Sequence, residues 1–144
     1  MLVLSFSTES YSDTFLFSKD NISFGCLDCG SRDEKSICSL YGNYGLEHSE
    51  YSIWNVNGIG NLQRQESPFS KNGKGLGIFD SNGDFKGHLH IDNSETNEFS
   101  KLLNYAWLDA KQSHFRTKQN FCKLMRQKFG YRIKSTTDLE ILSD

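Results

Sequence analysis

The chain has 144 residues, a formal net charge of -2 and four cysteines. This length fits one domain with its own hydrophobic core, so we expect residues 1–144 to form a single unit. No stretch approaches the roughly 20 apolar residues of a membrane-spanning helix, and the N-terminus lacks the basic segment of a signal peptide. We therefore expect a cytoplasmic protein with reduced thiols and no membrane partner.

Alternation of apolar and polar side chains predicts an antiparallel, turn-rich β region over residues 1–92. In chain order, strands are expected at residues 2–6, 15–18, 22–27, 75–80 and 84–91. The second and third of these form one predicted hairpin, and the last two form another. The second hairpin contains Asn82-Gly83, a pair that favours a two-residue turn because both positions tolerate positive φ.

Between the two hairpins, residues 36–75 contain one short phrase three times: SICSLYG from Ser36, SIWNVNG from Ser52 and SPFSKNG from Ser67. Each copy places two apolar or ring residues before a small polar residue, and a glycine follows three positions later. We expect buried anchors at Ile37, Ile53, Trp54 and Phe69, and turns with positive φ at Gly42, Gly58 and Gly73. A structural platform for the second hairpin is the favoured interpretation, and ligand binding by exposed turns is the alternative.

The three phrases resemble the tandem Ser-Ile-x-Asn-x-Tyr-Gly-x-Tyr-Gly repeats of an uncharacterised group of bacterial proteins. In that group the repeats lie between two strands of the form Phe-(x)-Gly-x-Leu, and both flanks are present here, as FGCLDC at 24–29 and FKGHLH at 85–90. The resemblance covers about residues 20–91, and the third copy departs from it at Pro68. It implies a shared architecture and no particular activity.

From residue 92 onward the apolar period becomes that of a helix. Residues 93–134 are predicted to hold two helices, the first capped by Asp92 or Ser94 and reaching Ala110, the second over about 117–129. The predicted fold class is therefore α+β, with an antiparallel turn-rich β region and short internal repeats covered by two C-terminal helices.

One candidate metal site follows from superposing the two flanking strands, which matches Cys26 with His88 and Asp28 with His90. If these strands are neighbours, Cys26, Asp28 or Cys29, His88 and His90 converge as a zinc site, because thiolate and imidazole are suitable ligands. The alternative is two surface histidines and ordinary buried thiols. DSNGD at 80–84 lacks the later glycine and glutamate of a calcium loop.

The strongest functional signal is charge placement, because residues 111–134 hold 8 Lys/Arg and no acid, whereas residues 1–110 hold 8 Lys/Arg and 15 Asp/Glu. Such a cluster is the electrostatic signature of a nucleic-acid or partner contact. Its alternatives are a solvated helix face, docking on the protein's own acidic body, and self-association. The candidate contact residues are Arg116, Lys118, Lys123, Arg126, Lys128 and Arg132.

No nucleophile–base pattern and no phosphate loop is present in the sequence. We therefore expect a non-enzymatic, macromolecule-binding accessory protein without a cofactor, whose partner is another protein, a second copy of itself or nucleic acid. The alternative is a small zinc-binding domain or metal-dependent enzyme that uses Cys26, Cys29, His88 and His90.

Overall fold

The computed structural model describes residues 13–92 and 97–129. The predicted strand at 2–6, the cap candidate Ser94, and Arg132 lie outside these residues. No helix within the described ranges is long and apolar enough to cross a membrane.

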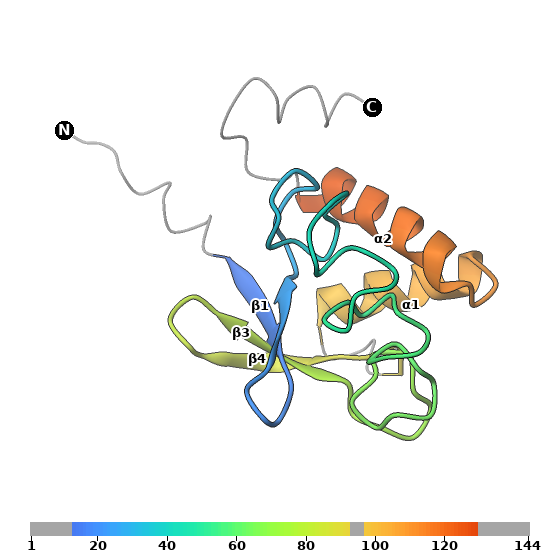
Figure 1. The fold of residues 1–144 in the computed structure, drawn as a ribbon, viewed down its shortest axis with the longest axis horizontal. Coiled ribbons are helices and arrows are strands. Elements are labelled where there is room, and N and C mark those ends of the chain that lie inside the picture. Colours follow the sequence, from blue (N-terminus) through green and yellow to red (C-terminus); the bar gives the residue numbers. More distant parts are fainter. Residues whose placement is uncertain (1–12, 93–96, 130–144) are drawn as a thin grey trace.

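Four strands form one antiparallel sheet: β1 (Thr14–Phe17), β2 (Ser23–Cys26), β3 (Leu76–Asp80) and β4 (Phe85–Leu89). Two helices follow, α1 (Glu98–Asp109) and α2 (His114–Phe129). Figure 1 shows the helices next to each other, with the long segment between β2 and β3 running alongside them. This arrangement confirms the predicted α+β class.

The sheet is built from two hairpins with matching geometry. Its strand order is β2-β1-β3-β4, so β1 and β3 pair in the centre and each carries its hairpin partner at an outer edge. The register pairs Phe15 with Cys26 in one hairpin and Gly77 with His88 in the other. Gly25 and Gly87 also share an unusual backbone, with φ of 104° and 107°. The two edge strands are therefore structural equivalents, as the sequence superposition predicts, but they lie at opposite edges.

The β3–β4 turn differs from the predicted two-residue type. Gly83 has a φ of 86°, whereas Asn82 is not among the described residues with positive φ. The carboxylate of Asp80 accepts hydrogen bonds from the backbone N–H of Asn82 and of Asp84, and the loop spans Ser81, Asn82 and Gly83. A three-residue loop that ends in a left-handed glycine is a common alternative to the two-residue turn.

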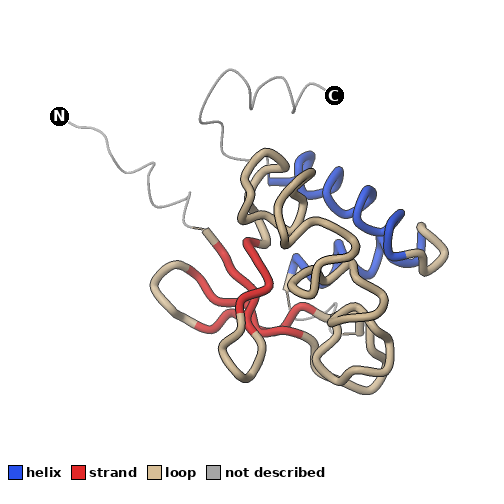
Figure 2. The backbone as a smooth tube through the Cα atoms, viewed as in Figure 1, coloured by secondary structure: helices blue, strands red, loops and turns tan. Residues whose placement is uncertain are grey.

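The repeat segment is a run of three-residue turns, drawn in tan between β2 and β3 in Figure 2. From Asp33 to Ser70, the N–H of every third residue donates to the carbonyl oxygen three positions earlier; at Gly42 the acceptor is instead the hydroxyl of Ser39. At Gly45 and Leu46, two successive N–H groups donate to the carbonyl of Gly42. This one-residue shift explains why the first two copies are 16 residues apart and the last two 15.

The repeat glycines do not serve the predicted purpose. None of Gly42, Gly58 and Gly73 is among the described glycines with positive φ. A Cβ at Gly42 would overlap the carbonyl oxygen of Glu34, and a Cβ at Gly73 would overlap that of Gln65. At these two positions glycine is needed because another backbone segment passes too close for a side chain.

The third residue of each copy is an anchor that contacts the helices. Cys38 forms a disulfide with Cys122 of α2. Trp54 lies on Phe121, with ring centroids 6.2 Å apart, and Phe69 lies on Trp107, at 4.5 Å. Burial of the predicted anchors is confirmed for Ile37, Ile53, Trp54 and Phe69.

The repeats meet the sheet at both of its edges, so they are more than a platform for the second hairpin. Ile37 donates to the carbonyl of Cys26 beside β2, and Ile91 donates to the carbonyl of Pro68 just after β4. One buried cluster joins sheet, repeats and helices. The repeat segment is therefore the layer that joins the helical hairpin to the sheet.

Helix α1 begins later than predicted. Its N-cap is Asn97, whose side-chain oxygen accepts a hydrogen bond of 2.8 Å from the backbone N–H of Ser100. An asparagine cap satisfies one of the free N–H groups of the first turn. Helix α2 begins at His114, three residues before the predicted start.

The expectation of reduced thiols is wrong in this structure. All four cysteines lie within the described residues, and they form the pairs Cys26–Cys29 and Cys38–Cys122. Disulfides are rare in the cytoplasm, so the two pairs weigh against the expected cytoplasmic placement.

Candidate functional site

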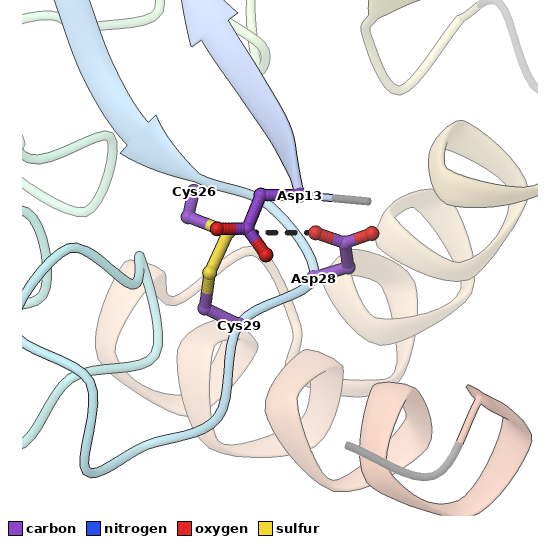
Figure 3. Close-up of side chains that lie close together, drawn as sticks. All are labelled: Asp13, Cys26, Asp28 and Cys29. Atoms are coloured by element: carbon purple, nitrogen blue, oxygen red, sulfur yellow. Dashed lines mark hydrogen bonds between the residues drawn. A yellow bond between two sulfur atoms is a disulfide. The ribbon is translucent and has the colours of Figure 1, made fainter. Parts of the chain in front are cut away.

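Four chemically active side chains gather where β1 begins and β2 ends. Asp13 precedes β1, Cys26 is the last residue of β2, and Asp28 and Cys29 follow in the adjoining loop. One sulfur or carboxylate oxygen from each residue lies within 4.8 Å of the others. Figure 3 shows the four side chains pointing toward one another. We call this group the Cys–Asp corner.

Backbone hydrogen bonds fix the frame of the corner. Leu27 donates to the carbonyl of Thr14, and Cys26 donates to the carbonyl of Lys35, both at 2.7 Å. The carbonyl of Cys29 accepts a 2.8 Å hydrogen bond from the buried hydroxyl of Ser36, the first residue of the first repeat. The chain is therefore tied on both sides of the Cys26–Cys29 disulfide.

Asp28 links this frame to the sulfur chemistry. Its Oδ1 accepts a 2.9 Å hydrogen bond from the backbone N–H of Thr14 and lies 3.4 Å from Sγ of Cys26. A disulfide sulfur carries no hydrogen, so the second contact becomes a hydrogen bond only when Cys26 is a thiol. The hydrogen bonding of Asp28 therefore depends on the oxidation state of Cys26.

Burial sets the electrostatics of the corner. Cys26 is 0% and Cys29 2% exposed. Burial raises the pKa of Asp28, and the hydrogen bond from Thr14 opposes that rise. On the other side, Nζ of Lys35 lies 3.5 Å from Oδ2 of Asp13. The corner thus concentrates negative charge that one half-exposed lysine partly offsets.

The predicted zinc ligands do not converge. Cys26 lies in β2 and His88 in β4, and these strands are at opposite edges of the sheet. The imidazole of His90 is 2% exposed: Nδ1 accepts from the N–H of Asp92, and Nε2 meets the hydroxyl of Ser70 at 3.2 Å. His90 therefore ties the third repeat to the end of β4. The condition for a Cys26, Cys29, His88, His90 site, that the two strands be neighbours, is not met.

His88 has a different environment from His90. Its ring packs edge-on against Phe85, with centroids 5.1 Å apart. Its pKa is lowered by burial, and next by the positive charge of Lys74. A histidine kept neutral beside an aromatic ring has an ordinary packing role.

The basic residues of α2 divide into an inner and an outer set. Thr117, Phe121 and Met125 are buried and define the inner face. Lys118 also turns inward, where its ammonium donates to the carbonyls of Ser39 and Gly45 at 3.0 and 2.7 Å. Desolvation lowers the pKa of Lys118 as a result. Lys118 therefore caps the first repeat, and its ammonium is engaged by the protein's own carbonyl groups.

The outer face of α2 keeps its charge toward solvent. Arg116 and Lys123 are exposed and Arg126 is half-buried; we call these three residues the basic stripe. None of them forms an ion pair with another described residue. Lys128, in contrast, lies 3.1 Å from Glu98 of α1. Of the six predicted contact residues, three thus remain available in the described part of the chain.

Sequence reasoning missed Asp13 as a member of the corner, and it considered Asp28 only as an alternative to Cys29 in the histidine-containing site. Asp28 was visible, because it lies between the two cysteines of a Cys-x-x-Cys string. Asp13 was not, because it joins the group only through the pairing of β1 with β2. Pairing register is a tertiary property that a single short strand does not specify.

Comparison of the chain with protein-family models, with curated proteins and with solved structures finds no match. The resemblance to bacterial repeat proteins stays a prediction, and the site geometry has to support any function by itself.

Proposed function

We propose that this protein is a non-enzymatic accessory protein that binds a partner protein of acidic surface through the basic stripe of α2. The observation that carries the proposal is the contrast between Lys118 and the stripe. Lys118 is satisfied by the protein's own carbonyl groups, whereas Arg116, Lys123 and Arg126 have no carboxylate partner among the described residues. An external anionic surface would supply one.

Charge separation in the fold supports the same proposal. Residues 97–129 hold seven Lys/Arg and two Asp/Glu, whereas residues 13–92 hold seven Lys/Arg and eleven Asp/Glu. A field of one sign over one face steers an oppositely charged partner and raises its association rate.

A protein partner is favoured over nucleic acid by exposed apolar side chains on α1 and α2. Phe115, next to Arg116, is 49% exposed, and on α1 Tyr105 and Leu108 are 64% and 60% exposed. Aromatic residues and arginine are enriched in the centre of protein interfaces, whereas nucleic-acid binding domains are generally far more basic than this chain, whose pI is about 6.1.

The two disulfides favour a protein that acts in an oxidising compartment, because such bonds persist there and are rare in the cytoplasm. This placement replaces the cytoplasmic one in our proposal.

The proposal is tested with defined polyanions. We expect the protein to bind poly-L-glutamate, with an affinity that falls as salt rises. The triple variant Arg116→Glu, Lys123→Glu, Arg126→Glu should lose this binding. The matched control Lys19→Glu, Lys71→Glu, Lys74→Glu changes the net charge equally at exposed lysines outside the helices, and it should bind like the parent protein.

Three outcomes overturn the proposal. Equal loss in both triple variants would mean that only net charge matters. Tighter binding of a DNA duplex than of poly-L-glutamate, at matched charge and salt, would assign the stripe to nucleic acid. Dimerisation that the stripe variant abolishes, measured by sedimentation, would assign it to a second copy of the chain.

A further inference from the structure

We propose that the Cys–Asp corner is a zinc site that becomes available on reduction. Its ligands are Sγ of Cys26, Sγ of Cys29, and one carboxylate oxygen each from Asp28 and Asp13. In the disulfide form the site is closed to metal. This proposal is independent of partner binding by α2, because the corner and the basic stripe share no residue.

The spacing of the four side chains fits a tetrahedral ion. Zinc bonds of about 2.3 Å to sulfur and about 2.0–2.2 Å to oxygen place neighbouring ligand atoms roughly 3.3–3.8 Å apart. The ligand atoms here already lie within 4.8 Å of one another. Once the sulfur–sulfur bond is broken, side-chain rotation is enough to reach that geometry, while the bonds from Leu27 to Thr14 and from Cys26 to Lys35 hold the backbone.

The donor set selects the metal. Two thiolates favour zinc over calcium and magnesium, which take oxygen ligands. Carboxylates complete the coordination, and Lys35, 3.5 Å from Asp13, offsets part of the remaining negative charge. In the oxidised corner only the two carboxylates are left, so zinc affinity should be lost with the thiolates.

The gating step balances as an ordinary thiol–disulfide exchange. A small dithiol transfers two electrons and two protons to the Cys26–Cys29 bond, giving two protein thiols and the disulfide of the reductant. Zinc then displaces both thiol protons to solvent as it binds. Asp28, 3.4 Å from Sγ of Cys26, accepts the thiol hydrogen bond in the intervening metal-free state and moves to the metal afterwards.

The experiment measures zinc bound to the full chain by elemental analysis and titration, with and without prior reduction by a dithiol that is then removed anaerobically. We expect one zinc per chain after reduction and none before it. Cobalt in place of zinc should show the thiolate-to-metal absorption and the visible bands of a tetrahedral site. Re-oxidation should release the ion.

Variants distinguish these four ligands from the remaining cysteines and histidines of the chain. Cys26→Ser with Cys29→Ser should abolish binding, and Asp28→Asn, which keeps an acceptor for Thr14, should weaken it by at least about tenfold. The Cys38→Ala, Cys122→Ala protein tests whether the other cysteine pair takes part, and it should still bind one zinc. His88→Ala should also bind normally, because His88 is in the opposite edge strand.

No zinc in the reduced parent protein would overturn the proposal, as would unchanged affinity in Asp28→Asn. Loss of zinc in His88→Ala, with folding intact by circular dichroism, would restore the histidine-containing site instead. Folding of the cysteine variants is checked in the same way, and Asp28→Asn keeps the test decisive if they fail to fold.

Discussion

The two disulfides of this protein differ greatly in the number of residues that separate their cysteines along the chain. Cys38–Cys122 links the first repeat to α2 across 84 residues, whereas Cys26–Cys29 spans three. Chain-entropy models give a cross-link more stabilising effect the longer the loop that it closes. The long-range bond therefore holds the architecture, and the short one contributes little to it, which leaves its oxidation state free to change.

The surroundings of the two disulfides also differ. The long-range bond adjoins the buried anchors Trp54 and Phe121, whose ring centroids are 6.2 Å apart. The short bond lies beside two carboxylates, in a corner where burial works against the charge of Asp28. Apolar packing is the setting of a structural bond, whereas the two carboxylates beside Cys26–Cys29 supply oxygen ligands for a metal once the bond is reduced.

The largest effect is expected from removing one bond at a time. Cys38→Ala with Cys122→Ala should lower the free energy of unfolding by about 4–5 kcal/mol, and Cys26→Ala with Cys29→Ala by about 1–2 kcal/mol. Chemical denaturation of the two double variants, under non-reducing conditions, measures both values. Equal losses, or a larger loss at Cys26–Cys29, would show that the short bond is also structural.

The sequence predicted the local elements well because they depend on local patterns. The two hairpins and both helices follow from alternation and from the helical apolar period, and the anchors Ile37, Ile53, Trp54 and Phe69 follow from the repeat. The equivalence of Gly25 and Gly87 could also be predicted, because both edge strands contain the pattern Gly-x-Leu.

The sequence did not predict which segments of the chain lie next to each other. Cys26 and His88 occupy equivalent positions, but equivalence says nothing about adjacency, and the pairing of β1 with β3 puts them at opposite edges. Cysteine pairing and the inward turn of Lys118 depend on the same tertiary arrangement. A three-residue period in Ser, Asn and Gly was present over residues 36–73, with a one-residue shift at Gly45–Leu46 and an exception at Arg64, and it would have predicted the turns.

An intermediate effect is expected at the glycines of the two edge strands. Ala at Gly25 or Gly87 meets the same backbone cost, because φ is 104° and 107°. A Cβ at Gly25 would also lie 2.7 Å from Cβ of Tyr44, whereas at Gly87 the nearest atom is Nδ2 of Asn97 at 3.5 Å. We expect losses of roughly 2–4 kcal/mol for Gly25→Ala and about 1–2 kcal/mol for Gly87→Ala.

Urea denaturation of both glycine variants provides the comparison. A larger loss at Gly25 would show that the strand leading to Cys26 is held by packing as well as by its disulfide. If Gly87→Ala costs as much, the packing of Tyr44 against Gly25 adds nothing to the stability of β2.

The smallest effect is a pH dependence set by Asp28. Its pKa is raised in the folded protein above the ordinary value of 3.8, mainly by burial, so the folded state binds the proton more tightly than the unfolded state. The free energy of unfolding should therefore fall as pH rises from the unfolded pKa through the folded pKa, and level off above it. Asp28→Asn should remove this fall, which denaturation midpoints between about pH 3 and pH 7 will measure.

Asp84→Asn is the matched control, because Asp84 is an exposed carboxylate immediately before β4, and it should follow the parent protein. Parallel curves for parent and Asp28→Asn would contradict the burial argument. If the parent protein loses stability with rising pH and Asp28→Asn does not, the ionised carboxylate of Asp28 lowers the stability of the fold at neutral pH. An asparagine would avoid this loss and would still accept the hydrogen bond from Thr14. A stabilising role would not favour aspartate over asparagine at that position, whereas a role as a metal ligand would, because a carboxylate binds a cation more strongly than an amide does.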